Sequence, residues 1–468
     1  MIALTPSEIA DAIGGRLVHA RGGAEEAPIT AQSQTDSREV APGEIFVARR
    51  GEETDGHLFA AQAVDRGAAL LIVEREIDDR VPQIVVDDAT LALGRLAKAV
   101  VRLALDAGKL RIVGITGSNG KTTTKNLVAA MAERVGPTIA SAKSFNNEVG
   151  GPLTMLRVEA DTETLVAEMG ASAEGEIARL TDMAPPHIGV VLSVGLAHAG
   201  EFGGIETTFR TKSEMVRELP ETAVAVLNRD DPWVSRMAEL TRARIVWFGQ
   251  HSEAAVRASD IEGSAEGTTF TLHLGGESLP VHFRVLGEHH VANAMAAATI
   301  GLELGLTPAQ IVETLESATL AAPGRMQVLS GRDGITVVND AYNASPDSMS
   351  AALKTLAQIG KPGARTVAVL GAMSELGDLA GEEHDRIGLQ VVRLGISELV
   401  VVGKEARRLH ISAINEGSWD GESVFFEDHD EALAYLSRTV QPGDTVLVKS
   451  SNAAGLQRLG DRLGEALA

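Results

Sequence analysis

A glycine-rich stretch, TGSNGKTTT at residues 116–124, restricts the fold of this 468-residue chain more than any other feature. It follows the apolar run LRIVGI at residues 110–115, which predicts a buried strand, and Lys121 opens a predicted helix. Gly117 and Gly120 let the backbone approach an anion, which N–H groups and the positive helix end then stabilise. We therefore expect a phosphate-binding loop between a strand and a helix. From these residues alone, the alternative is a chance glycine-rich turn.

The spacing of the glycines in this loop is unusual. A Walker sequence, G-x-x-x-x-G-K-[ST], that ends at Lys121 and Thr122 requires glycine at position 115, where the chain has Ile. The chemistry is unaffected, because Lys121 can reach the outer phosphates of a nucleotide and the Thr122 hydroxyl can bind Mg²⁺. ATP and Mg²⁺ are therefore the expected ligands.

The alternation of apolar and amphipathic segments predicts an α/β fold. Residues 110–248 alternate short apolar strands with helices, which implies a mostly parallel sheet covered on both faces. An alternating strand pattern at 255–286 predicts an antiparallel flap, and a second strand–helix series follows residue 325. We expect three domains: a small mixed α/β N-terminal domain (1–108), a central P-loop parallel-sheet ATPase domain with the antiparallel flap (109–321), and a C-terminal Rossmann-like domain (322–468).

The composition argues against several classes of partner. Lys and Arg number 42 against 64 Asp and Glu, a formal charge of −22, whereas a nucleic-acid partner needs a basic face. No apolar run approaches ~18 residues, so we expect no membrane insertion, and the first residues do not form a secretory signal. The absence of cysteine excludes disulfides, thiolate metal sites and a cysteine nucleophile. A cytoplasmic monomer is the expectation.

Polar residues near strand ends supply further candidates. Glu168 interrupts the end of an apolar strand, where a carboxylate is costly unless it is paired or holds a metal ion. The carboxyl edge of a parallel sheet is also where ligands bind. His198 follows another strand end and is a possible metal ligand. The residues alone leave open a solvated Glu168 and a structural or surface His198, and they favour a surface position for Lys212.

Three later stretches carry weaker signals. Asn293 in GEHHVANAMAAA and Arg325 in APGRM are candidates to reach a base and a phosphate. In VVNDAYNASPDSM, Asp340, Tyr342 and Asn343 follow a strand, so they should face a ligand across the cleft from the phosphate-binding loop.

Together these stretches resemble the Mur ligases, the ATP-dependent amide-forming enzymes of peptidoglycan precursor synthesis. TGSNGKTTT is similar to the family's T-G-[TS]-N-G-K-T loop, which accounts for its glycine spacing. The stretches SFNNEVGGPLTML, NDAYNASPDSM and VLGAMSELGD are similar to one branch of the family, and the resemblance covers nearly the whole chain. It implies ligation of D-alanyl-D-alanine to UDP-N-acetylmuramoyl-tripeptide through an acyl phosphate, giving UDP-N-acetylmuramoyl-pentapeptide, ADP and phosphate.

The resemblance also implies roles for single residues. Asn293 would contact adenine, Arg325 the γ-phosphate and Asp340 the ribose. Lys212 matches the lysine that the family carbamylates with CO₂. The ATP phosphates would lie on Gly117, Ser118, Asn119, Gly120, Lys121, Thr122 and Thr123. The implied metal ligands are Thr122, Glu168 and His198, and the implied catalytic residues are Lys121, Lys212, Arg325 and His198. The UDP-sugar peptide would be held by Ser37, Arg38, Asn146, Asn147 and Glu148.

Two other functions remain open from the sequence. One is a different enzyme of the same superfamily, such as a folate polyglutamate ligase or another muramoyl ligase, which would use a different acceptor or amino donor. The other is a nucleotide-gated binding or regulatory protein, which would bind ATP without forming an amide.

Overall fold

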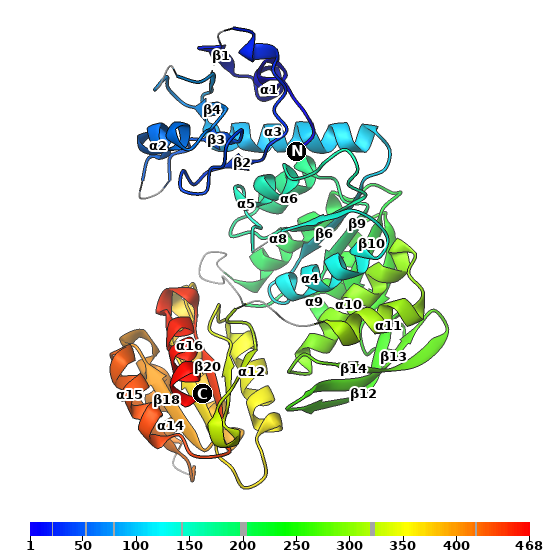
Figure 1. Ribbon diagram of the computed structural model, residues 1–468. Helices are drawn as coiled ribbons and strands as arrows, with labels where there is room; N and C mark the ends of the chain where they lie inside the picture. The colour runs from blue at the N-terminus through cyan, green and yellow to red at the C-terminus, as the bar shows by residue number, and fades with distance from the viewer. Residues whose placement is uncertain are drawn as a thin grey trace.

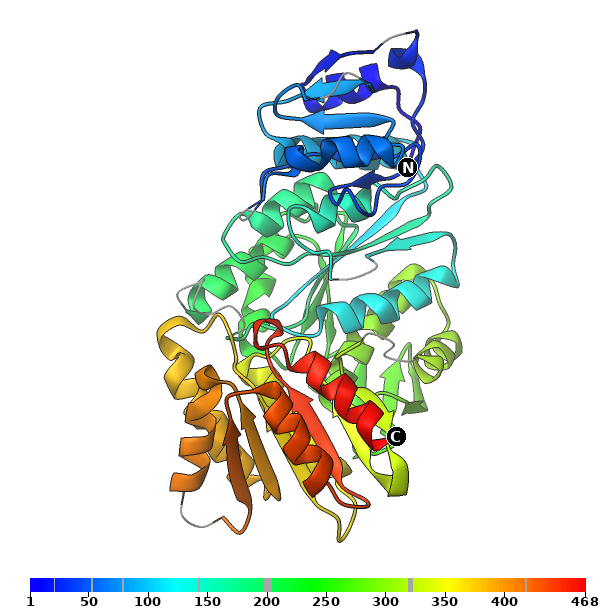
Figure 2. The same ribbon diagram turned by 60° about the vertical axis from the view of Figure 1, so that its left-hand side comes forward.

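The structure, a computed structural model, describes residues 1–20, 22–51, 54–77, 80–141, 144–196, 204–318, 323–416 and 419–468. Three lobes follow one another in chain order, with the central lobe between the N-terminal and C-terminal ones (Figure 1). A second view shows the same order (Figure 2). Within the described ranges, no helix is both long and apolar enough to span a bilayer.

The N-terminal lobe contains a five-stranded sheet of order β1-β5-β4-β3-β2, in which only the β1–β5 pair is antiparallel. The 18-residue helix α3 lies between this lobe and the central one and packs against α5 and α6 of the central lobe. The elements of this lobe are α1 (Pro6–Ile13), β1 (Arg16–Val18), β2 (Ser33–Gln34), β3 (Ile45–Val47), α2 (Ala60–Asp65), β4 (Leu70–Val73), β5 (Gln83–Val85) and α3 (Ala89–Asp106).

The central lobe contains a six-stranded, wholly parallel sheet of order β11-β10-β9-β6-β8-β7. Its strands are mostly apolar because helices cover both faces. The elements are β6 (Arg111–Thr116), α4 (Lys121–Glu133), β7 (Thr138–Ala140), α5 (Gly150–Met155), β8 (Thr164–Glu168), α6 (Glu176–Met183), β9 (Ile188–Val191), α8 (Ile205–Arg217), β10 (Val224–Asn228), α9 (Pro232–Arg236) and β11 (Arg244–Phe248).

The register of this sheet creates the candidate site. β6 lies between β8 and β9, with Ile115 opposite Glu168 and Thr116 opposite Val191. The glycine-rich loop, Glu168 and the segment after β9 therefore meet at one carboxyl edge, as the sequence predicted. The sequence reading did not include β7, a three-residue edge strand with half-buried side chains.

The antiparallel flap is confirmed as a three-stranded sheet of order β12-β13-β14, and two helices follow it. The bounds are β12 (Arg257–Ser264), β13 (Gly267–Leu274), β14 (Glu277–Phe283), α10 (His289–Leu304) and α11 (Pro308–Ser317). β12 also contacts α12 of the C-terminal lobe, so the flap is part of the boundary between the lobes.

The C-terminal lobe contains a six-stranded sheet of order β15-β16-β20-β17-β18-β19, parallel except for β15. The expected α/β class is thus confirmed, although the sequence reading omitted the edge strand β15. The elements are β15 (Gln327–Ser330), β16 (Thr336–Asn339), α12 (Pro346–Ile359), β17 (Thr366–Leu370), α13 (Ala380–Arg393), β18 (Glu398–Val402), α14 (Arg407–Asn415), β19 (Glu422–Phe426), α15 (His429–Thr439), β20 (Thr445–Lys449) and α16 (Leu456–Leu467).

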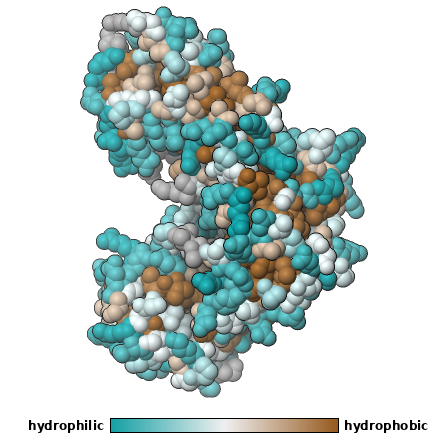
Figure 3. All heavy atoms as spheres, turned by 45° about the vertical axis from the view of Figure 1, so that its right-hand side comes forward, coloured by the Kyte–Doolittle hydropathy of each residue, from teal (hydrophilic) through white to brown (hydrophobic). Residues whose placement is uncertain are grey.

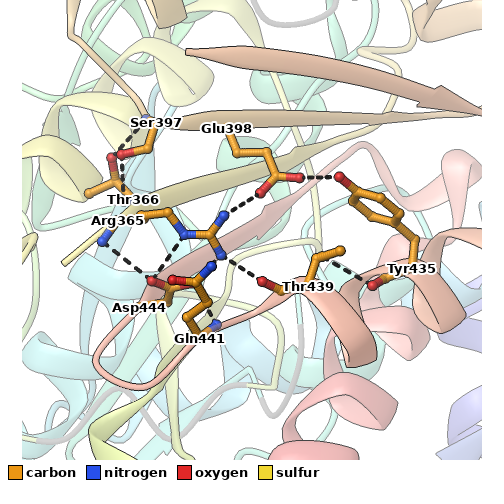
Figure 4. Close-up of polar contacts among 8 residues, drawn as sticks. All are labelled: Arg365, Thr366, Ser397, Glu398, Tyr435, Thr439, Gln441 and Asp444. Carbon is orange, nitrogen blue, oxygen red and sulfur yellow. Dashed lines mark hydrogen bonds and ion pairs between the residues drawn. The ribbon is translucent and has the colours of Figure 1, made fainter. Parts of the chain in front are cut away.

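A polar network ties together the amino ends of the strands in this lobe (Figure 4). The Arg365 guanidinium lies 2.6 Å from Asp444 and 3.2 Å from Glu398, whose side chains are 2% and 5% exposed. The Tyr435 hydroxyl donates to Glu398 at 2.7 Å, and burial together with that carboxylate raises the pKa of Tyr435 to about 12. The network lies at the edge opposite the candidate site, which indicates a structural role.

Replacing Arg365 with Met should lower the free energy of unfolding of this lobe by about 3 kcal/mol, because two buried carboxylates lose their cation. Urea unfolding followed by far-UV circular dichroism would measure the change. The control is Arg462→Met, which removes an exposed ion pair with Asp430 and should cost less than about 1 kcal/mol. Equal losses in the two variants would contradict a stabilising role for the network.

Candidate functional site

A cavity of about 620 Å³ lies between the central and C-terminal lobes. The same molecule seen in space-filling form is hollowed between its N-terminal and C-terminal lobes, with largely hydrophilic rims (Figure 3). The residues that line the cavity include Ser118, Asn119, Gly120, Lys121, Thr122, Thr123, Ser144, Asn146, Glu168, His290, Asn293, Arg325, Asp340, Tyr342, Asn343 and Lys449. The structure thus brings together most of the residues predicted to hold ATP and metal.

The glycine-rich loop is fastened to the segment after β9. The Ser118 N–H donates to the Ser193 carbonyl at 2.9 Å, and the Asn119 N–H donates to the Ser193 hydroxyl at 3.2 Å. α4 begins at Lys121, so its first N–H groups have no acceptor within the helix. The loop therefore presents backbone donors and the positive end of a 13-residue helix to the cavity.

Gly120 is required at the start of this helix, because its φ is +83° and a Cβ there would lie 2.2 Å from the Asn293 side-chain oxygen. Gly120→Ala should weaken ADP binding at least about tenfold, since the loop must shift away from the phosphates. The control is Gly175→Ala, which has a φ of +89° but nothing within 4 Å of the added Cβ. Calorimetric titration with ADP would separate the two, and equal affinities would contradict a phosphate-binding role for the loop.

The Lys121 ammonium folds back over its own loop. It donates to the carbonyl oxygens of Gly117 at 2.7 Å and Ser118 at 3.4 Å. Burial lowers its pKa, and the nearby Glu168 carboxylate opposes that shift. A bound phosphate would offer this half-buried cation a stronger acceptor than the two carbonyls do.

Glu168 is 2% exposed and lies at the end of β8, so the alternative of a solvated carboxylate is wrong. Its oxygens accept hydrogen bonds from the Thr122 hydroxyl at 3.0 Å and the Asn146 amide at 2.7 Å. A buried carboxylate beside a hydroxyl suits Mg²⁺, which takes few protein oxygens and completes its shell with phosphate and water. No cluster of three His, Asp or Glu side chains suited to metal occurs in the described parts of the chain. The donor set therefore fits Mg²⁺ bound together with a nucleotide.

Arg325 reaches the central lobe from a segment fastened to the C-terminal lobe. Its guanidinium lies over the Tyr342 ring, 4.2 Å from the centroid, and donates to the Ser144 hydroxyl at 3.2 Å. The flanking backbone is held by the C-terminal lobe, because the Tyr342 N–H donates to Gly324 and the Met326 N–H donates to Asp340. Arg325 thus adds a positive charge to the cavity from across the boundary between lobes.

Asp340, the predicted ribose contact, is already paired. The Lys449 ammonium lies 2.6 Å from its carboxylate and also donates to the Asn343 carbonyl at 3.0 Å. The side chain of Lys449 is only 3% exposed, so this pair fixes the junction of β16 and β20 at the cavity. A ribose hydroxyl would have to share Asp340 with Lys449.

Asn293, the predicted adenine contact, lies on α10 and is 6% exposed. Its amide lies 3.0 Å from Nδ1 of His290, and its oxygen accepts from the Thr124 hydroxyl at 3.3 Å. Burial lowers the pKa of the neighbouring His290 well below 6.5, so this ring is neutral at pH 7, whereas His289 is exposed. The predicted adenine contact therefore lies beside a neutral imidazole.

Lys212 is 2% exposed on α8, so the alternative of a surface lysine is wrong. Its ammonium lies 3.4 Å from the Ala171 carbonyl. Burial, with a contribution from the Lys121 charge, lowers the pKa of Lys212 to about 7. Lys212 lies outside the lining of the cavity.

The remaining predicted substrate and metal residues either do not line the cavity or lie outside the described part of the chain. Asn147 is exposed just before α5, where its side-chain oxygen accepts from the N–H groups of Val149 and Gly150, and Glu148 is exposed beside it. In the N-terminal lobe, the Ser37 hydroxyl donates to Gln62, and Arg38 pairs with Asp36. None of these lines the cavity, and His198 lies outside the described residues.

Three residues of the site were missed by sequence reasoning. Ser193 holds the glycine-rich loop, Ser144 joins Arg325 to Thr122, and Lys449 pairs with Asp340. Lys449 carried a usable signal, because it is a charged residue at the end of the apolar strand TVLVK, as Glu168 is in its own strand. The two serines carried none.

Models of three Mur ligase domains match the chain: the Mur ligase family catalytic domain at residues 32–100, the middle domain at 115–301, and the Mur ligase glutamate ligase domain at 324–452. A UDP-N-acetylmuramoyl-tripeptide–D-alanyl-D-alanine ligase from Mycobacterium bovis is 42% identical over 99% of this chain and 98% of its own.

Solved structures agree with that similarity. The crystal structure of MurF from Acinetobacter baumannii has 32% identity, covers 99% of both chains and superposes with a TM-score of 0.88. MurF ligase from Thermotoga maritima in complex with ADP has 29% identity over 94% of this chain and 98% of its own, with a TM-score of 0.81. The chain therefore belongs to the Mur ligase family.

Proposed function

We propose that the protein uses ATP to ligate D-alanyl-D-alanine to UDP-N-acetylmuramoyl-tripeptide, giving UDP-N-acetylmuramoyl-pentapeptide, ADP and phosphate. The observation that carries the proposal is the cavity in which the glycine-rich loop, Glu168 and Arg325 meet. The named relative, 42% identical over nearly the full length, supports this choice of substrates. ATP and Mg²⁺ are the cofactors, as expected of an ATP-dependent amide-forming ligase of this family.

The three lobes suit a reaction that joins two substrates at the expense of ATP. We assign the UDP-sugar peptide to residues 1–108, ATP to 109–321 and the dipeptide to 322–468. Ser37 and Arg38 would hold the uridine diphosphate end, and Asn146, Asn147 and Glu148 would line the peptide site. The amide of Asn146 already contacts Glu168, so it would link that peptide site to the metal site.

The chemistry follows from the weak reactivity of a carboxylate toward amines. A carboxylate oxygen of the tripeptide attacks the γ-phosphorus of ATP, and ADP leaves. The amine of the dipeptide then attacks the acyl phosphate, loses its proton and expels phosphate. The first-turn N–H groups of α4, Lys121 and Arg325 would hold the phosphate oxygens as charge develops on them.

When bound, Mg²⁺ supplies positive charge to the same phosphate oxygens, and Thr122 and Glu168 would hold it. The residues of the chain have a further task, which is to keep water from the acyl phosphate. Figures 1 and 2 show the C-terminal lobe below the central one, and we propose that it closes over the site when both substrates bind. We also propose that the protein acts in the cytoplasm as a monomer; in support of the monomer, the described residues of a single chain supply the glycine-rich loop, Glu168 and Arg325 of the cavity.

A mass-resolved ligation assay tests the function. Purified protein, Mg²⁺ and ATP are combined with UDP-N-acetylmuramoyl-tripeptide that carries either meso-diaminopimelate or lysine, with and without D-alanyl-D-alanine. We expect a pentapeptide and one phosphate per amide only when the dipeptide is present. Phosphate release with folate and glutamate would favour a folate polyglutamate ligase, and ATP binding without product would favour a regulatory protein.

A further inference from the structure

Ser144 bridges two parts of the site that belong to different lobes. Its hydroxyl oxygen lies 3.1 Å from the Thr122 hydroxyl at the start of α4. The same oxygen accepts a hydrogen bond from Arg325 at 3.2 Å. Ser144 therefore stands between a proposed metal ligand and the arginine that the C-terminal lobe carries.

These hydrogen bonds form a series from Arg325 to Glu168, and the chemistry of these two terminal residues fixes the direction of each bond. An ionised carboxylate only accepts, so the single hydroxyl proton of Thr122 is donated to Glu168, at 3.0 Å. The Ser144 hydroxyl must then donate its own proton to the Thr122 oxygen. Arg325 only donates, and it supplies the N–H that the Ser144 oxygen accepts. The result is one ordered path from Arg325 through Ser144 and Thr122 to Glu168.

This order leaves the Thr122 oxygen with a defined free lone pair. A hydroxyl oxygen has two lone pairs, and the hydrogen bond from Ser144 uses one of them. Because the Thr122 hydroxyl donates its proton to Glu168 in a hydrogen bond, the other lone pair of the Thr122 oxygen is available to a cation. Without Ser144, the Thr122 hydroxyl would lose one of the two contacts that fix its rotation.

Ser141, three positions before Ser144, is bound by a buried lysine. The Lys125 ammonium, on the second turn of α4, donates to the Ser141 carbonyl at 2.5 Å, and the side chain is 2% exposed. Thr154 also donates to the Ser141 hydroxyl at 3.3 Å. A buried ammonium is costly unless it is well bound, so this contact indicates that the backbone of Ser141 is firmly placed.

We propose that Ser144 is a positioning residue that couples Arg325 to the metal site, orienting the Thr122 hydroxyl for Mg²⁺ and holding the guanidinium beside the phosphates. The inference rests on the proposed function, because it assumes that Mg²⁺ and a nucleoside triphosphate bind here. It adds a residue to which neither the resemblance nor the loop pattern assigned a role.

The test measures binding of the β,γ-methylene analogue of ATP by calorimetry, with Mg²⁺ and with chelator. Without Mg²⁺, wild type and Ser144→Ala should differ by less than about threefold. With Mg²⁺, Ser144→Ala should lose about tenfold or more of the affinity that the ion adds in wild type, because the partner of a metal ligand is removed. Ser144→Thr keeps the hydroxyl and should retain most of the gain, and Ser437→Ala, on the outer face of α15, should match wild type.

The outcomes separate the two proposals. If wild type gains no affinity from Mg²⁺, the proposed function is wrong and the inference falls with it. If wild type gains affinity and Ser144→Ala gains as much, the inference alone is wrong. A double-mutant cycle with Arg325→Met adds a second criterion. The double variant should lose less affinity for the analogue than the product of the two single losses, and strictly multiplicative losses would overturn the coupling.

Discussion

Lys121→Ala should lower kcat by about 10³-fold, because it removes the cation that reaches the outer phosphates as charge develops on them. The ammonium is held by the Gly117 and Ser118 carbonyls and burial lowers its pKa, so little folding energy depends on its charge. The melting temperature should therefore change little. Phosphate release under saturating substrates would measure the loss of turnover, with thermal unfolding as the check on the fold.

Lys98→Ala is the matched control for Lys121→Ala. Lys98 lies on α3, half exposed and paired with Asp182, so its loss should leave turnover within about twofold of wild type. Wild-type turnover in the Lys121 variant would place the phosphate chemistry elsewhere. Loss of the fold in that variant would mean that the lysine stabilises the loop rather than the reaction.

Lys212→Ala should lower turnover by about 10- to 100-fold, and added short carboxylic acids should restore part of it. The pKa of about 7 leaves a large fraction of this amine uncharged at neutral pH. The neutral amine would add to CO₂ and release a proton, giving a carbamate with carboxylate-like oxygens. Mass spectrometry of protein trapped in bicarbonate would detect it, and the carbamylated fraction should rise as pH increases through 7.

Lys212→Arg separates the carbamate from a simple cation. Arginine keeps a positive charge but does not form the carbamate, so this variant should be inactive and should not respond to carboxylic acids. The stability effect has a defined sign, because the unfolded lysine binds its proton up to about pH 10. Burial of Lys212 therefore costs stability below pH 7, and that cost is relieved as pH rises from 7 toward 10. Full activity in Lys212→Arg would contradict carbamylation.

The sequence predicted the core of the site because parallel strands end at a common edge. Glu168 and Asp340 each mark the end of an apolar run, and the glycine-rich loop marks a third. Since these strand ends lie at carboxyl edges of parallel sheets, a linear pattern was enough to bring them to one cavity. Short edge strands such as β7 and β15 were not predicted, because three or four half-exposed residues produce no clear hydrophobic pattern.

The residues that were missed depend on distances that sequence spacing does not encode. Ser144 is 22 positions from Thr122 and 181 from Arg325, and Ser193 is 74 positions from Asn119. Each is a neutral hydroxyl in a loop, and such residues are common outside functional sites. Lys212 was misjudged from the residues alone because its helix looked amphipathic, whereas the side chain is buried near the carbonyl of Ala171.

The attachment of Arg325 to the C-terminal lobe has a consequence for ATP consumption without ligation. Its flanking residues bond to Asp340 and Tyr342, so this guanidinium travels with the lobe assigned to the dipeptide. If that lobe moves away from the central lobe as proposed, a bound nucleotide would lose one of its neutralising charges. Hydrolysis of ATP without ligation would thereby be suppressed until the amine donor arrives, and no separate sensor would be required.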